Sequence, residues 1–151
     1  MSNSTDIRTG RHVVHQIHIH LVFVTKYRKT VFTAAMLNCL QLTFAKVCND
    51  FESELIEFEG ERGHVHLLIN YPPKVTLSKL VNGLKGVSSR ILRKNFSKEL
   101  AKFLWKGVLW SPSYFAGSCG GATLNVIKQY IQNQNSPQSE ISRNVCLTSS
   151  T

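Results

Sequence analysis

The sequence predicts an α+β fold in which one antiparallel sheet carries its helices on a single face. Two observations favour this fold. Segments with strand-like and helix-like spacing of apolar residues follow one another in the order β-α-β-β-α-β, which is the ferredoxin-like or RRM-like plan. The chain has 151 residues, 42% of them hydrophobic, which suffices for one well-buried core and is too short for two ordinary domains.

The first half of the chain contains the first four of these elements. Residues 13–24 are rich in β-branched and aromatic types and predict a strand. Residues 33–51 place apolar side chains three and four apart after Thr33, a possible N-cap, and predict a helix. Residues 52–61 and 64–71 predict two strands joined by a turn that contains glycine.

The second half completes the pattern. Residues 76–96 have apolar side chains at helical spacing and predict a second helix with a basic outer side. Residues 109–119 predict a short aromatic strand, and residues 121–135 a last helix that begins after a glycine pair. The expected domain organisation is a flexible N-terminus, one domain and a flexible polar tail, over residues 1–11, 12–135 and 136–151 respectively.

Composition argues against a membrane protein and against a disulfide scaffold. No stretch approaches the roughly 20 apolar residues of a membrane span, and the start lacks the apolar centre of a signal peptide. We therefore expect a cytoplasmic protein with no membrane partner. The cysteines show no C-x-x-C spacing, and we expect reduced thiols that mostly pack, at positions 39, 48, 119 and 146.

Positive charge is concentrated in one segment. The net charge is +9, and nine Lys and Arg residues stand against the single acid Glu99 between Lys74 and Lys106. A basic segment of this kind most often binds nucleic acid phosphates, although a solvated surface helix has the same composition.

Two histidines lie one residue apart in a predicted strand. Because residues i and i+2 point to the same face, His64 and His66 stand roughly 6 to 7 Å apart at their Cα atoms, close enough to bind one metal ion. On this spacing alone, two half-exposed histidines on a sheet, without a metal, are the more common case. His18 and His20 form a second such pair, and in this fold their strand neighbours that of the first pair.

Tyr130 and Gln134 lie four residues apart in the last predicted helix and therefore on one face of it. A tyrosine in a helix is usually a packing residue. Beside a metal bound by two imidazoles and an amide oxygen, however, a phenol oxygen can attack a polarised phosphorus. Together with the histidine pair, this arrangement describes a tyrosine nucleophile that breaks DNA.

Four blocks of sequence resemble the HUH-type, single-tyrosine transposases (TnpA) of small bacterial and archaeal insertion sequences, which move DNA as a single strand. The family is named after a His, hydrophobic, His motif, which is "HVH" here. The blocks occur in the family's order and span nearly the whole chain, at residues 20–29, 63–68, 84–93 and 120–134.

The resemblance implies a role for individual residues. His64, His66 and Gln134 match the metal ligands of the family, for which the metal is Mg²⁺ or Mn²⁺, and Tyr130 matches the nucleophile. His20 stands where the family often has a histidine, which implies a contact with the metal ligands or with DNA.

The resemblance also implies an activity and its partners. The protein is expected to cleave and rejoin single-stranded DNA at insertion-sequence ends through a 5′-phosphotyrosine intermediate, and to recognise DNA hairpins. It is expected to form homodimers in which the tyrosine helix of one subunit can complete the histidine site of the other. The candidates for phosphate contacts are Lys26, Arg28, Lys85, Arg90 and Arg93.

Two other functions remain open on the sequence alone. The same fold supports a non-catalytic protein that binds single-stranded RNA or DNA on its open sheet face, which requires neither Tyr130 nor a metal. A chromosomal relative of the transposases, which processes repeated hairpins without moving an element of its own, has the same residues. Hairpins that bracket the gene would indicate a mobile element.

Overall fold

The structure, a computed structural model, describes residues 8–9, 14–103 and 108–118. Within them the secondary structure follows the predicted order, with short additions. The elements are β1 (Arg8–Thr9), β2 (Val14–His15), β3 (His18–Thr25), η2 (Lys26–Arg28), α1 (Ala34–Asp50), β4 (Glu54–Gly60), β5 (His64–Asn70), α2 (Leu77–Asn95), α3 (Ser97–Ala101) and β6 (Trp110–Ser118).

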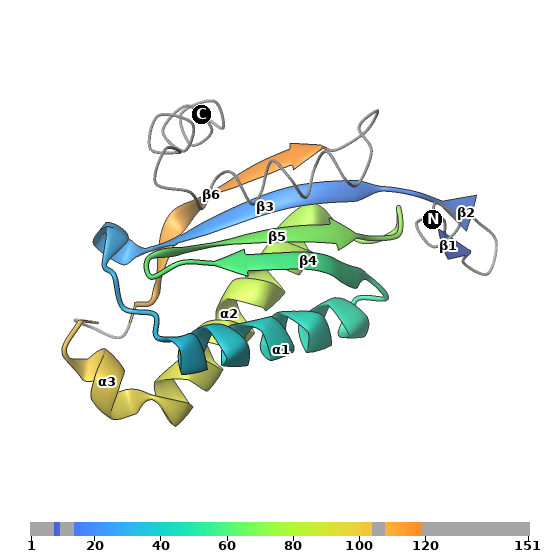
Figure 1. Ribbon diagram of the computed structural model, residues 1–151. Helices are drawn as coiled ribbons and strands as arrows, with labels where there is room; N and C mark the ends of the chain where they lie inside the picture. Colours follow the sequence, from blue (N-terminus) through green and yellow to red (C-terminus); the bar gives the residue numbers. More distant parts are fainter. Residues whose placement is uncertain (1–7, 10–13, 104–107, 119–151) are drawn as a thin grey trace.

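Four strands form one antiparallel sheet in the order β4-β5-β3-β6. This is the ferredoxin-like arrangement, and the predicted fold class is confirmed. Figure 1 shows α1 and α2 together on one face of the sheet. The last predicted helix, over residues 121–135, lies outside the described residues.

The helix α1 begins and packs as its sequence predicts. The Thr33 hydroxyl accepts a hydrogen bond from the Met36 backbone N–H at 3.3 Å, so the expected N-cap is confirmed. Buried side chains recur three and four residues apart, because only one side of the helix faces the sheet. They are Met36, Leu40, Thr43, Phe44, Val47 and Cys48.

Gly83 lies in the middle of α2 at its contact with α1. A Cβ atom at this position would stand 2.9 Å from the Phe51 ring and 3.5 Å from Val47. The two helices can therefore approach closely because Gly83 has no side chain. This close approach offsets the lower helix propensity of glycine.

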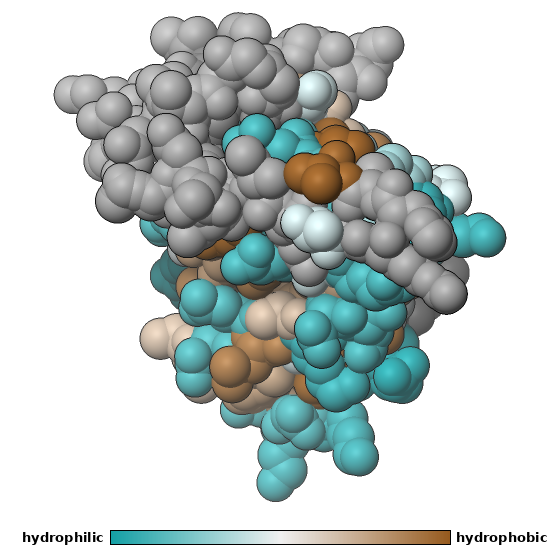
Figure 2. Space-filling model, turned by 90° about the vertical axis from the view of Figure 1, so that its right-hand side faces the viewer, coloured by the Kyte–Doolittle hydropathy of each residue, from teal (hydrophilic) through white to brown (hydrophobic). Residues whose placement is uncertain are grey.

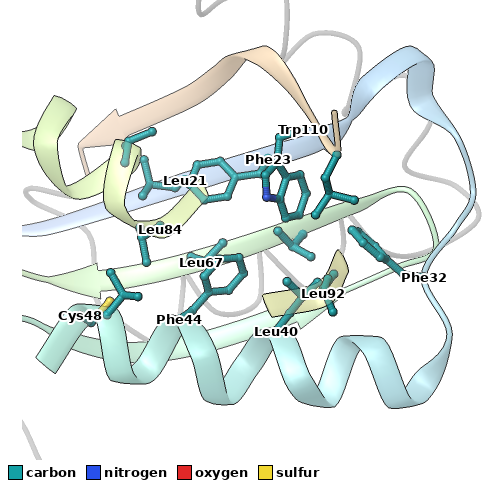
Figure 3. Packing of buried hydrophobic residues seen from close by; sticks show 14 of the residues in the cluster. Leu21, Phe23, Phe32, Leu40, Phe44, Cys48, Leu67, Leu84, Leu92 and Trp110 are labelled. Atoms are coloured by element: carbon teal, nitrogen blue, oxygen red, sulfur yellow. The ribbon is translucent and has the colours of Figure 1, made fainter. Parts of the chain in front are cut away.

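The core lies between the sheet and the two helices and is centred on aromatic rings. Figure 3 shows Phe23 of β3 and Trp110 of β6 packed toward Phe44 of α1, and the ring centroids of Phe23 lie 5.7 Å from Trp110 and 6.0 Å from Phe44. The buried indole N–H of Trp110 donates to the Ser88 hydroxyl at 3.0 Å. The polar atom of the largest core ring is thus satisfied, as burial requires.

The structure departs from the predicted boundaries in the N-terminal region. The strand expected over residues 13–24 is divided, since β2 pairs with β1 in a separate two-stranded sheet and β3 begins at His18. Arg8 and Thr9 of the segment expected to be flexible are thus paired.

Figure 2 shows that hydrophilic residues surround a few hydrophobic ones on the helical layer, which forms the lower part of that view.

Candidate functional site

The strand β5 sends its histidines and its aliphatic residues to opposite faces. Val65, Leu67 and Ile69 are completely buried in the core cluster beneath the helices. His64 and His66 therefore lie on the other face, as the alternation predicts. They are only 9% and 1% exposed, so the alternative of two half-exposed histidines is wrong.

The geometry of the pair suits one shared metal ion. The ring centroids of His64 and His66 lie 5.2 Å apart with the rings nearly perpendicular, and both Nε2 atoms are buried. Two imidazoles are an incomplete ligand set, and in residues 8–9, 14–103 and 108–118 no cluster of three or more His, Cys, Asp or Glu is placed to hold a metal. A further donor is required, and an amide oxygen would bring the set closer to the preference of Mg²⁺ or Mn²⁺ for oxygen.

His20 contacts His66 directly. Its Nε2 lies 3.1 Å from His66 Nδ1, and the two rings stack with their centroids 5.3 Å apart. Burial lowers the pKa of His20 to about 4, so its imidazole is neutral near pH 7. A neutral His20 can accept a hydrogen bond from the His66 Nδ1–H, and His66 would then present its Nε2 to a metal.

His18 does not share this environment. In the strand register His18 pairs with Asn70, whereas His64 pairs with Val24. Val24 lies six residues from His18 along β3, a distance of about 20 Å. The two H-x-H pairs therefore do not form one cluster of four histidines. His20 of the first pair contacts the second pair at His66.

Glu59 is a residue of this face that sequence reasoning missed. It lies directly opposite His66 in the β4–β5 pairing, and Glu57 lies opposite Leu68. Burial, and then repulsion from Glu57, raise the pKa of Glu59. The sequence does contain a signal, because Glu57 and Glu59 alternate with Phe58 and therefore share one face of the strand. Two acids are too costly to bury in the core, so their face must be the one opposite to it.

Lys85, one of the predicted DNA contacts, is bound within the fold. Its Nζ donates to the backbone carbonyls of Ser111 at 2.7 Å and Pro112 at 3.3 Å, and it lies over the rings of Phe23 and Tyr114. Burial lowers its pKa. Lys85 thus holds α2 against β6.

The other predicted DNA contacts lie in two places. Lys26 and Arg28 belong to the turn η2 at the end of β3, near the start of the histidine strand. Arg90 and Arg93 lie on α2, which covers the face of the sheet opposite to the histidines, and Arg90 lines a shallow groove between α1 and α2. A DNA molecule that contacts both groups of cations must therefore pass from one side of the protein to the other.

Tyr130 and Gln134 lie outside the described residues, so their predicted roles stay predictions. Of the cysteines, Cys48 is buried in the core, where burial raises its pKa to about 12, and Cys39 is a partly buried free thiol. Both agree with the expected packing role. None of the described helices is sufficiently long and apolar to cross a membrane.

The fold and the buried histidine pair are those expected of a DNA transposase with a single nucleophilic tyrosine. The chain matches the sequence model of the family described as "Transposase IS200 like" over residues 13–134. It therefore belongs to the IS200-like transposase family. Membership of this family implies DNA cleavage and strand transfer.

Individual relatives agree with this assignment. The ISDra2 transposase TnpA of Deinococcus radiodurans is 31% identical over 129 residues, which cover 85% of this chain and 91% of the relative. The transposase of insertion sequence IS200 from Salmonella typhimurium is 30% identical over 116 residues, 76% of this chain and 74% of the relative.

Solved structures agree as well. The crystal structure of a transposase from Deinococcus radiodurans has a TM-score of 0.68 at 32% identity and covers 84% of this chain and 97% of its own. A REP-associated tyrosine transposase bound to a REP hairpin has a TM-score of 0.56 at 12% identity, over 82% of this chain and 67% of its own. This second similarity concerns the fold alone.

Proposed function

We propose that this protein cleaves and rejoins single-stranded DNA at the ends of an insertion sequence, with Tyr130 as the nucleophile. The proposal rests mainly on the buried pair of His64 and His66, whose rings lie 5.2 Å apart in a chain of a transposase family. Gln134 completes the ligand set in this proposal. Mg²⁺ or Mn²⁺ bound by these three residues would draw charge from the scissile phosphate.

In the cleavage step the phenol oxygen of Tyr130 forms a bond to phosphorus, and the bond between phosphorus and the 3′ oxygen breaks. The phenol gives its proton to solvent or a base, and the departing 3′ oxygen takes up a proton from solvent or an acid, so the products are a 5′-phosphotyrosine and a free 3′-hydroxyl. Because the new phosphodiester conserves the energy of the broken one, a 3′-hydroxyl can later displace Tyr130 and rejoin strands. His64 and His66 orient the phosphate for both steps.

Hairpin recognition and a shared dimeric site belong to the same proposal. The net charge of +9 favours a polyanionic substrate, and a transposase of the same fold has been solved with a hairpin. Arg90 and Arg93 lie on α2, on the helical side of the sheet, and can bind the phosphates of a folded DNA stem while the unpaired DNA strand passes to His64 on the other side. Substituting both arginines should weaken binding to a hairpin and reduce its salt dependence.

The test is covalent capture of a labelled single strand that covers the DNA beside the gene, with Mn²⁺ present. The parent protein should give an adduct that survives denaturation. Tyr130→Phe should bind the strand and form no adduct, because it lacks only the attacking hydroxyl. His64→Ala should also form none, whereas His18→Ala, a matched control from the other H-x-H pair, should remain active.

Two results would contradict the proposal. An adduct from Tyr130→Phe would transfer the nucleophile role to another tyrosine, such as Tyr27 or Tyr114. Full activity of His64→Ala together with loss in His18→Ala would show that the wrong histidine pair was assigned.

A further inference from the structure

The turn η2 exposes an aromatic ring among cations. Tyr27 is 79% exposed, the highest value among the large hydrophobic side chains in the described part of the chain. Lys26 Nζ lies 5.4 Å from the centroid of the Tyr27 ring, and Arg28 and Lys29 follow with exposed side chains. Neither of the two ion pairs found among the described residues involves these cations.

The backbone of the turn is held in an unfavourable conformation. Tyr27 has φ 60° and ψ 20°, and Arg28 has φ 54°, both in the left-handed region that favours glycine. A bulky residue rarely adopts this conformation, and strain of this kind persists where the surroundings enforce it, often at functional sites. The position would suit glycine better, yet it carries a tyrosine.

Hydrogen bonds at both ends of the turn enforce this conformation. The Lys26 backbone N–H donates to Leu109 O at 2.9 Å. The Thr25 hydroxyl donates to Lys29 O at 2.6 Å and lies 3.2 Å from Gly63 O. The chain between these anchors must bulge outward, which projects the Tyr27 ring into solvent.

The same anchors tie the turn to the histidine strand. Gly63 immediately precedes His64, and its carbonyl also accepts the Thr25 backbone N–H at 3.0 Å. Val24 pairs directly with His64, and Tyr27 follows Val24 by three residues. Figure 1 shows this turn, in blue, at the end of the sheet where β4 connects to β5. The Cα atoms of Tyr27 and His64 are therefore at most about 16 Å apart. A few nucleotides of single-stranded DNA span this distance.

We propose that Tyr27 stacks on an unpaired nucleobase of the strand whose scissile phosphate lies at His64 and His66. Single-stranded nucleic acid is commonly bound by aromatic rings for the bases and by cations for the backbone, and this turn combines the two. Lys26, Arg28 and Lys29 hold the adjoining phosphates. The inference rests on the proposed function, since it assumes that a single strand reaches the histidine pair.

The test uses the flanking-DNA strand with 2-aminopurine in place of one adenine at a time, because stacking quenches its fluorescence. Binding of the parent protein should quench one or two positions near the cleaved bond. Tyr27→Phe, which keeps the ring, should retain the quench. Tyr27→Gly, which suits the backbone and lacks the ring, should lose it and bind about 5- to 150-fold more weakly.

Matched measurements separate binding from folding. Tyr27→Gly should melt no lower than the parent, because the ring is exposed and glycine tolerates the backbone. Leu42→Ala, which removes an exposed side chain (67%) from α1 on the other layer, should leave affinity and quenching unchanged.

The outcomes distinguish the two proposals. If the parent binds and cleaves the strand while Tyr27→Gly retains its affinity and its quench, the stacking role is refuted and the proposed function stands. If Tyr27→Gly instead alters only the oligomeric state in sedimentation, the ring contacts a second copy and not DNA. If the parent neither binds nor cleaves the strand, both proposals fail.

Discussion

Replacing His20 with phenylalanine tests whether this residue positions a metal ligand. A phenyl ring is planar like the imidazole and slightly larger, so it keeps the edge contact with Phe115, whose ring centroid lies 5.5 Å from that of His20. The change removes Nε2, which lies 3.1 Å from His66 Nδ1. His66 then loses the partner that fixes its tautomer and its ring orientation.

The magnitude follows from the contact. Removing a group that hydrogen-bonds a metal-binding histidine typically lowers metal affinity 10- to 100-fold, which is about 1.4 to 2.7 kcal/mol. We expect a loss in this range for Mn²⁺ with His20→Phe. Protein stability should also fall by about 1 to 3 kcal/mol, because the Nδ1–H of His66 loses this acceptor in a buried site.

Calorimetric titration with Mn²⁺ measures the first effect, and urea unfolding the second. His18→Phe is the matched control, since His18 pairs with Asn70, whereas His66 pairs with Val22, four residues further along β3. Equal affinity of His20→Phe and the parent would refute the positioning role of His20. A similar loss in His18→Phe would show that the strand register does not decide which histidine matters.

Three further predictions concern pH, Lys85 and subunit exchange. The pKa of His20 is about 4 in the folded protein and 6.5 in the unfolded chain. The free energy of unfolding should therefore fall by about 3 kcal/mol between pH 6.5 and pH 4, because the unfolded chain binds the proton first. Urea unfolding of His20→Phe should lack this part of the pH dependence. Lys85→Met keeps the packing stem and removes the hydrogen bonds to two carbonyls, so we expect the free energy of unfolding to fall by about 1 to 2 kcal/mol, seen as a lower melting temperature, with little change in DNA affinity. A large loss of DNA affinity at unchanged stability would contradict this. If the sites are shared between subunits, mixing Tyr130→Phe with His64→Ala should restore covalent adduct formation, whereas inactive mixtures with proven heterodimers would argue for sites within one chain.

Sequence alone determined the features that depend on local spacing. The period of two in β5 assigned Val65 and Leu67 to the core and His64 and His66 to the opposite face, and the structure confirms it. The period of three and four, with Thr33 as N-cap, likewise defined α1 within one residue of each end. Such features follow from a single segment and the need to bury its apolar side, so no knowledge of distant residues is required.

Tertiary structure decided which distant residues meet. Register placed His20 against His66 and left His18 beside Asn70, although the two histidines look alike in the sequence. The contact of Lys85 with the carbonyls of β6 likewise depends on how α2 packs. The sequence shows only the charge of Lys85, and that charge suggested a phosphate contact.

The strand β4 shows the physical reason most clearly. Strict alternation would place Glu57 and Glu59 on the same face as Leu55, which pairs with the core residue Ile69. The register shifts between Leu55 and Glu57, as in a β-bulge that inserts one extra residue, and both acids turn to the face of His66. A shift of one residue exchanges the two faces of a strand. The sequence indicates that the two acids avoid the core, but the position of the shift is set by pairing and packing across the sheet.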